Sequence, residues 1–231
     1  MLYTQQSVMD NIRNREGRRV FYLGRGDQLT ASAREYLSRE RIDILSADMA
    51  KKESYRLLNG AVLEQKPEQM THLNAEVLVL KTHPRILLRG ALDTLESELL
   101  LCQLVTDAQI SQCVGQILDF ARQIIRSDVL NEPFSIDSLC GLTQAELRRR
   151  SHFPQEYYNQ AHFMPSKEDG HAILQLNRAR CAARQAELYG VAAFTDTDGN
   201  PTREDILRAL NRMSSMLYIL MIQCKAKKSL G

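Results

Sequence analysis

Two arginines and a glutamate recur at helical spacing in the stretch NRARCAARQAE, which begins at Asn177. Wound at about 100° per residue, Asn177, Arg180, Arg184 and Glu187 fall on one narrow stripe with apolar residues on both flanks. A stripe flanked in this way is expected to face the protein interior. Planar guanidinium groups one turn apart suit phosphate oxygens, and several together suit a polyphosphate. The pattern therefore makes the stripe a candidate anion clamp.

A purely structural role explains the same pattern, because buried arginine–glutamate pairs also occur as packing devices. Taken alone, the stripe favours this structural interpretation, since charges set in apolar surroundings mark functional sites only some of the time. The opposite arc of the same helix carries Gln175, Arg178, Gln185 and Tyr189, and we expect it to face solvent.

Two further groups of residues bear on the choice. In VLVLKTHPRILLRGALDTLESELL, Lys81 and Arg85 lie just before a predicted helix. Asp93 is a lone acid inside that pattern, suitably placed to pair with an arginine of the stripe. In ALNRMSSMLYIL, Asn211 and Ser214 lie beside an apolar seam. Together these groups offer cations, a carboxylate and an amide on separate helices.

The elements that must position these residues are mostly helices. Apolar residues step by four and three over 88–102, 110–124 and 206–224, which is the seam of antiparallel bundle packing. A shorter helix is predicted at 143–151, where it begins at the capping-box spacing TQAE. A further helix is predicted at 171–190. In DTDGNP, Pro201 suits the first position of the last helix.

Residues 1–70 have a different pattern, with short apolar runs typical of strands. Strands are expected at 18–24 and 41–45, with a helix between them in which Ser32 and Glu35 have capping-box spacing. Residues 50–69 are polar and predict a connector. The fold class is therefore an all-α bundle of about five helices with a small N-terminal α/β extension, divided into 1–70 and 71–231.

Composition excludes several function classes. The chain of 231 residues has a net charge of +2, 6% aromatic residues and no Trp, which argues against nucleic-acid binding. The N-terminus lacks the apolar core of a signal peptide, and the apolar runs are too short to span a membrane. Five scattered cysteines without CxxC indicate free thiols in a reducing, cytoplasmic setting.

Over about residues 70 to 228, these motifs together resemble the ATP:corrinoid (cobalamin) adenosyltransferases, most closely the ethanolamine-utilisation (EutT) type. KTHPRILLRGALDTLES is similar to that family's Lys-x-x-Pro-Arg segment leading into Gly-x-Leu-Asp. RARCAARQAE resembles its Arg-x-x-x-Arg-x-x-Glu helix, and ALNRMSSMLYIL its Leu-Asn-Arg-Leu-Ser segment. LNEPFSIDSLCGLTQAELRRRSH matches the ethanolamine type rather than the propanediol type.

The resemblance implies an enzyme whose helical bundle binds ATP, with Mg²⁺, and a reduced corrinoid. The Co(I) centre would attack the 5′ carbon of ATP, so the protein needs no nucleophile of its own. Site roles carried over from the family are as follows. Arg180 and Arg184 hold phosphate, Asp93 pairs with Arg180, Glu187 and Asn211 orient the nucleotide, Lys81 and Arg85 contribute phosphate or subunit contacts, and Phe163 and His162 lie against the corrinoid.

The resemblance also implies a homo-oligomer, with a trimer favoured, and a corrinoid reductase and microcompartment proteins as candidate partners. In location it implies the cytoplasm, with a bacterial microcompartment as a candidate site. The alternative is a non-catalytic bundle that docks in a microcompartment or carries the corrinoid, for which the N-terminal extension would serve. The Arg180, Arg184, Glu187 and Asn211 set separates the two, because a scaffold has no reason to keep it buried.

The chain departs from the family in three places. The spacing from Pro165 to Arg180 is about two residues longer than the family's, and Phe163 is equally well explained as an ordinary core or loop aromatic. LGRGDQLT is a poor match to the phosphate loop of propanediol-type members, and Gly24 and Gly26 are better explained as turn glycines. The cysteine cluster of some ethanolamine-type members is missing, since no cysteine precedes Cys102. We therefore expect no thiolate-bound metal, and we expect His72 and His83 to be ordinary surface or satisfied residues.

Overall fold

The computed structural model describes residues 1–15, 17–47, 54–135 and 137–229. By contacts the chain forms two compact units, Met1–Tyr55 with Val62–Gln65 and Arg56–Ala61 with Lys66–Gly231. The sequence-based boundary at residue 70 stays a prediction. Within the predicted connector, residues 50–53 lie outside the described residues.

The first unit is a small α/β body with its own core. A three-stranded sheet has the order β2 (Arg13–Arg15), β3 (Arg18–Leu23), β5 (Asp43–Ser46), in which β3 runs parallel to β5 and antiparallel to β2. The remaining elements are β1 (Leu2–Tyr3), α1 (Gln5–Met9), β4 (Gln28–Leu29) and α2 (Ala31–Arg39). Their apolar residues bury a cluster around Phe21.

The local predictions for this unit are confirmed in type and corrected in detail. Both strands and the helix predicted between them are present as β3, β5 and α2. The helix cap is Thr30, whose hydroxyl accepts from the Ala33 amide, rather than Ser32. Gly26 has a φ of +89° in a turn closed by Asp27 N–H donating to the Gly24 carbonyl, which agrees with its prediction as a turn glycine.

The polar stretch predicted as a connector contains strands where the structure describes it. β6 (Tyr55–Leu57) and β7 (Val62–Leu63) belong to a sheet of order β7-β6-β9-β8, with β8 at Met70–His72 and β9 at Val77–Leu80. β6 pairs parallel with β9, and β8 pairs antiparallel with it. Strands of two to four residues are too short for a hydrophobic alternation to be recognised, so the sequence pattern did not reveal them.

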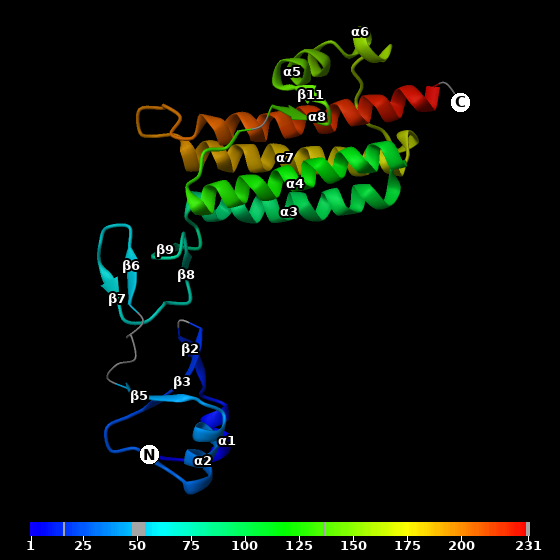
Figure 1. Ribbon diagram of the computed structural model, residues 1–231. Coiled ribbons are helices and arrows are strands. Elements are labelled where there is room, and N and C mark those ends of the chain that lie inside the picture. The colour runs from blue at the N-terminus through cyan, green and yellow to red at the C-terminus, as the bar shows by residue number, and fades with distance from the viewer. Residues whose placement is uncertain (16, 48–53, 136, 230–231) are drawn as a thin grey trace. The chain divides into compact units, whose positions relative to one another are not determined.

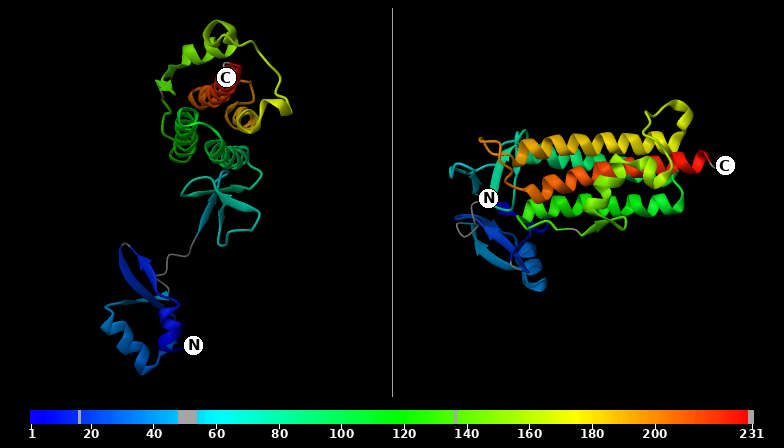
Figure 2. Two further views of the ribbon diagram at one scale, coloured as in Figure 1. Left: turned by 90° about the vertical axis from the view of Figure 1, so that its right-hand side faces the viewer. Right: turned by 90° about the horizontal axis from the view of Figure 1, so that it is seen from above.

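Four long helices form the bundle: α3 (Pro84–Val105), α4 (Ala108–Leu130), α7 (His171–Phe194) and α8 (Glu204–Ser229). They lie side by side in Figure 1, and the left view of Figure 2 looks along them. α7 packs between α3 and α8. Two short helices, α5 (Gln144–His152) and α6 (Pro154–Tyr158), pack on α8. The hairpin of β10 (Ser138–Leu139) and β11 (Leu142–Thr143) lies beside α5, and the 3-10 turn η2 (Lys167–Asp169) lies against α7. The predicted helical bundle with a small α/β extension is confirmed.

Helix starts follow sequence signals in most cases. Pro84 begins α3 behind the cap residue His83, and Thr143 and Glu146 form the predicted capping box of α5. The prediction for Pro201 is wrong, because α8 begins at Glu204 and Pro201 instead bridges to Thr195. The turn between α7 and α8 therefore extends further than the proline suggested.

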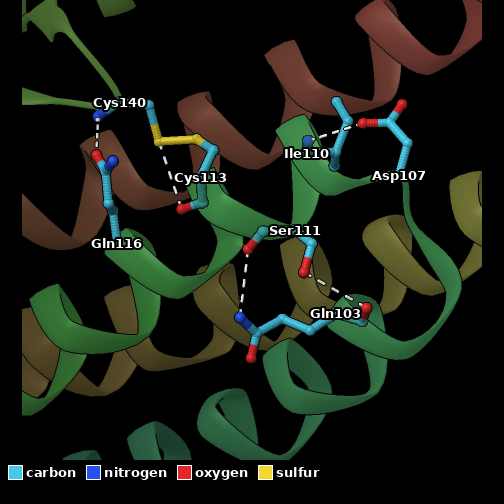
Figure 3. The surroundings of a disulfide bond; sticks show 7 residues. All are labelled: Gln103, Asp107, Ile110, Ser111, Cys113, Gln116 and Cys140. Atoms are coloured by element: carbon cyan, nitrogen blue, oxygen red, sulfur yellow. Dashed lines mark hydrogen bonds between the residues drawn. A yellow bond between two sulfur atoms is a disulfide. The ribbon is translucent and has the colours of Figure 1, made fainter.

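The expectation that all five cysteines are free is wrong for two of them. Cys113 of α4 and Cys140 form a disulfide, shown in Figure 3. Cys140 and Gly141 are the two turn residues of the β10–β11 hairpin, and both have positive φ, 52° and 74°. The bond therefore fixes the tip of this hairpin to α4. A sequence separation of 27 residues gave no pairing signal.

Small residues allow α8 to approach α7 closely. Ala179, Ala183 and Ala186 of α7 are fully buried, and Gly190 continues the same face. A Cβ placed on Gly190 would overlap Cδ1 of Leu210, whose side chain is itself fully buried. The separation of the two helices is thus set by the absence of a side chain at Gly190.

We expect Gly190→Ala to lower the free energy of unfolding by about 1 kcal/mol. Overpacking costs about 1–3 kcal/mol, and the better helix propensity of alanine returns about 1 kcal/mol. Chemical denaturation measures the change. Gly115→Ala in α4 is the matched control, since its Cβ would meet only the end of the Gln103 side chain, at 3.1 Å. A Gly190→Ala protein at least as stable as the Gly115→Ala protein would contradict the close-packing argument.

The start of α8 is tied to the segment after α4 by Asp205. Although partial burial opposes it, hydrogen bonds from Arg203 and from the backbone amides of Phe134 and Ile206 lower the pKa of Asp205 to about 2. A carboxyl whose pKa is lowered in the folded state stabilises the fold above its unfolded pKa, near 3.8, and loses that contribution as the pH falls toward 2.

We therefore expect Asp205→Asn to be less stable than the wild type by about 1–2 kcal/mol at neutral pH, after discounting for solvent screening. The difference in unfolding free energy between the two proteins should shrink as the pH falls below about 4, because the wild-type carboxyl then becomes protonated. Denaturation curves at a series of pH values measure it, with Asp198→Asn in the exposed turn as control. A gap that stays constant with pH would exclude the carboxylate as its source.

Candidate functional site

The candidate site lies along the seam between α7 and α8. Three α8 residues seven positions apart, Asn211, Tyr218 and Lys225, contact α7 or the segment before it. Because seven residues are close to two helical turns, they share one side of α8. Each of the three has a polar or aromatic contact across the seam or with the segment before α7.

At one end of the row, Asn211 Nδ2 donates to Glu187 Oε1 of α7, 2.8 Å away. The Asn211 Oδ1 accepts from Arg212 Nη1 at 2.7 Å. Burial lowers the pKa of Arg212, and Arg148 and Arg208 lower it further. Glu187 and Asn211, which the sequence assigned to one nucleotide site, are thus in direct contact.

In the middle of the row, Tyr218 meets two predicted site residues. The Arg180 guanidinium lies over the Tyr218 ring, 5.7 Å from its centroid, and donates two hydrogen bonds of 3.3 Å to Asn177 Oδ1. The His162 ring stacks on Tyr218 at a centroid distance of 5.8 Å, and its Nδ1 lies 2.8 Å from the Tyr218 hydroxyl. Tyr218 therefore joins Arg180 to the segment predicted to face the corrinoid.

At the other end, Lys225 lies under the same segment. Its ammonium is 5.4 Å from the centroid of the Phe163 ring and forms an ion pair with the buried carboxylate of Asp169. The Asp169 Oδ2 also accepts from the Ser166 amide at 2.7 Å. The hydrogen bond from Lys225 has the largest effect in lowering the pKa of Asp169, and the hydrogen bond from the Ser166 amide lowers it further. Phe163 is thereby held half-buried beside α8.

Arg184 stands apart from these contacts. Its side chain is exposed, and among the described residues it forms no ion pair or hydrogen bond. It lies one turn from Arg180 and one turn from Glu187 on α7. Its guanidinium is therefore available to an external anion.

The predicted stripe lies at the edge of the buried face of α7 and not along its middle. Asn177, Arg180 and Glu187 are half-buried, while the centre of the face is the alanine row. The expected solvent side is also wrong at Gln175, which is buried and donates to Glu98 of α3 at 2.6 Å. The helix is buried against two neighbours, so its buried face is displaced from the single stripe inferred from the pattern.

The predicted contact between Asp93 and Arg180 does not form within the chain. Asp93 is exposed on α3, and Arg180 bonds to Asn177 instead. The pattern around Asp93 suggested an inward-facing acid because leucines surround it, but the outer face of α3 is itself rich in leucine.

Lys81 and Arg85 have different surroundings. The exposed Lys81 ammonium lies 3.1 Å from Glu68. The Arg85 Nε donates to the buried carboxylate of Asp128 at 2.6 Å, and Arg89 donates to the other oxygen of the same carboxylate. Arg85 is thus engaged in joining α3 to the end of α4, which leaves Lys81 as the more available cation.

The described residues hold no group of three or more His, Cys, Asp or Glu side chains arranged for a metal ion. His83 caps α3 through Nδ1, which accepts from the Arg85 amide at 3.2 Å, and its pKa is lowered by burial and by Arg85. Burial raises the pKa of the Cys102 thiol to about 12. No helix in the described ranges is long and apolar enough to cross a membrane.

Sequence reasoning missed Tyr218, Lys225 and Asp169. The signal for the first two was present, because they repeat the Asn211 position at intervals of seven. Asp169 lies in a short turn with no periodicity, and only its three-dimensional contact with Lys225 identifies it.

Comparison with known proteins places these elements in a family. Residues 61–224 match the family model described as cobalamin adenosyltransferase. Similar curated relatives are the corrinoid adenosyltransferases EutT of Salmonella typhimurium strain LT2, 34% identical, and of Escherichia coli K12, 32% identical, each over 166 residues. These alignments cover 72% of this chain and 62% of each relative. The chain thus spans less than two thirds of the length of the relatives it matches.

Among solved structures, the chain is similar to a PduO-type ATP:corrinoid adenosyltransferase from Lactobacillus reuteri, complexed with cobalamin and ATP, in a variant with one phenylalanine replaced by histidine. That likeness has a TM-score of 0.48 and 14% identity, and it covers 80% of this chain and 92% of the other. A variant of the same protein with alanine in place of that phenylalanine gives a TM-score of 0.47.

Proposed function

Because the chain belongs to the cobalamin adenosyltransferase family, we propose that it transfers the 5′-deoxyadenosyl group of ATP to the Co(I) centre of a reduced corrinoid, yielding adenosylcobalamin. The cobalt electron pair forms the new bond to the 5′ carbon, the bond from that carbon to the phosphate oxygen breaks, and the polyphosphate leaves with the electrons of that bond. ATP enters as its Mg²⁺ salt, because a hard dication suits phosphate oxygens.

The single observation that carries this proposal is the available Arg184 guanidinium one turn from Arg180, at the edge of the α7–α8 seam. A leaving polyphosphate gains negative charge as the bond breaks, and cations already in place stabilise that charge without reorganising. Lys81 contributes a further phosphate contact. Glu187 and Asn211, held together at 2.8 Å, orient the nucleotide. Phe163 and His162 lie against the corrinoid.

The protein is mixed with Mg²⁺, ATP and chemically reduced cobalamin, and the Co(I) absorbance is followed with time. We expect an ATP-dependent loss of the Co(I) band and the appearance of adenosylcobalamin. A Co(I) band that decays equally with and without ATP would contradict the proposal. An ATP analogue in which a methylene group replaces the 5′ oxygen provides the negative control, because its polyphosphate cannot leave from the 5′ carbon.

Arg184→Ala should lower kcat by about 10²–10³-fold, as loss of one preorganised charge-stabilising donor does elsewhere. Because the side chain is exposed and has no partner in the described ranges, the melting temperature should stay unchanged. Steady-state kinetics and thermal unfolding measure both quantities. Arg178→Ala, on the same helix but paired with Glu98, is the matched control for kcat. Near-normal turnover by the Arg184→Ala protein would exclude a role for Arg184 in catalysis.

We further propose that the chain forms a homo-oligomer, with a trimer favoured, through the outer face of α3. At about 100° per residue, Asp93 and the exposed leucines 100, 101 and 104 share this face, and Leu104 is 80% exposed. An apolar face of this kind is a common subunit contact. Asp93 pairs with Arg180 of the second copy, which explains why both charges lack that pairing within one chain.

Leu104→Asp should therefore dissociate the oligomer, because it introduces a charge into a buried apolar contact. Size-exclusion chromatography with light scattering gives the molar mass. The control is Leu130→Asp, at the exposed end of α4. A wild-type protein that is monomeric at micromolar concentration would exclude the subunit contact.

The runner-up function is docking in a microcompartment or carrying the corrinoid without catalysis. One observation favours a docking role for part of the chain, since the N-terminal unit has its own core and lies almost wholly outside the matched residues 61–224. A corrinoid reductase and microcompartment shell proteins are the proposed partners, and the cytoplasm or the microcompartment lumen is the proposed location. Binding of cobalamin without ATP-dependent loss of Co(I) would favour this function.

A further inference from the structure

We propose that Tyr218 is a positioning residue that couples the corrinoid side of the site to the phosphate side. The inference rests on the proposed function, because it uses the roles given there to His162 and Arg180. Tyr218 itself touches neither reacting atom. The Tyr218 hydroxyl contacts His162, and the Tyr218 ring stacks on His162 and also lies against the Arg180 guanidinium.

The hydroxyl fixes the orientation of His162. His162 lies in an extended segment without regular structure, and its side chain is exposed. Its Nε2 is 3.1 Å from the His152 carbonyl oxygen, which can only accept, so Nε2 carries the proton. In the neutral ring Nδ1 is then the acceptor, and the Tyr218 hydroxyl donates to it at 2.8 Å. Loss of the hydroxyl therefore leaves Nδ1 without its donor, and the ring keeps the hydrogen bond to His152 and its stacking on residue 218.

The ring face restrains Arg180. A guanidinium within about 6 Å of an aromatic centroid is attracted to the ring face, and here the distance is 5.7 Å. Within the described ranges, the hydrogen bonds of Arg180 are two long ones to Asn177, one turn away on the same helix. Since Tyr218 is on α8, it is the contact that fixes Arg180 relative to the neighbouring helix.

His162 and Arg180 therefore share one support. A shift of the Tyr218 ring moves the donor to His162 and the partner of the guanidinium together. Phe163, next in sequence to His162, is held independently by Lys225. The two roles of Tyr218 are separable, because phenylalanine keeps the ring face and removes the hydroxyl, while leucine removes both.

The test compares Tyr218→Phe and Tyr218→Leu with the wild-type protein. Tyr218→Phe should raise the KM for reduced cobalamin about 2- to 10-fold, the usual effect of one lost hydrogen bond, and leave the KM for ATP within about twofold. Tyr218→Leu should raise both. His162→Ala should raise the corrinoid KM as Tyr218→Phe does, and the double variant should be no worse than the poorer single variant. Tyr157→Phe, on α6 outside the site, is the control.

Calorimetric titrations with Mg²⁺–ATP and with hydroxocobalamin repeat the comparison without turnover. A wild-type protein that binds both ligands with this split between variants, yet consumes no Co(I), would overturn the proposed function and keep the coupling. Turnover by the wild type together with equal effects of Tyr218→Phe and Tyr218→Leu on both ligands would overturn the coupling, as would additive effects of His162→Ala and Tyr218→Phe. Lack of corrinoid binding by the wild type would also overturn it. If Tyr218→Leu fails to fold, Tyr218→Phe and the double variant still decide.

Discussion

The contact of Gly190 with Leu210 is the constraint on which the rest of the bundle depends. It brings α7 and α8 close enough for short side chains on one helix to touch those on the other. Asparagine and glutamate have little reach, so the Glu187–Asn211 hydrogen bond of 2.8 Å requires this separation. The apolar contact therefore sets the distance, and the polar contacts use it.

Helix α7 thus carries two rows of side chains, a buried row of alanines and a row of polar and charged residues at its edge. The alanine row of α7 is buried and supplies the packing, while the row at its edge supplies charge. Charges at the edge of a buried face avoid most of the desolvation cost that a fully buried arginine would meet. They still have low-dielectric walls beside them, which strengthens their attraction for an anion. Under the proposed function, this position would combine attraction for a polyphosphate with a small desolvation cost.

Much of this architecture could be predicted from the sequence, because long helices leave a strong periodic signal. The helices α3, α4, α7 and α8 and the capping box at Thr143 were predictable for that reason. The side chain of Asp93 was not, since a leucine-rich outer face has the same pattern as an inner one. The Cys113–Cys140 bond and the contact of Asp169 with Lys225 join segments that are far apart in the sequence. Local hydrophobic periodicity does not reveal such contacts.

The spacing of Asn211, Tyr218 and Lys225 has a consequence for how the gene can change in length. One residue inserted between Asn211 and Tyr218 would turn the remainder of α8 by about 100°. Lys225 and Tyr218 would then leave the seam together, and the contacts with Arg180 and Asp169 would be lost at once. An insertion in the loop at 195–203 would leave all three in register, because loop closure depends only weakly on length. Insertions and deletions in such proteins are thus expected in the turn before α8. Within α8, substitutions can be tolerated, but an insertion or deletion would rotate one part of the helix relative to the other.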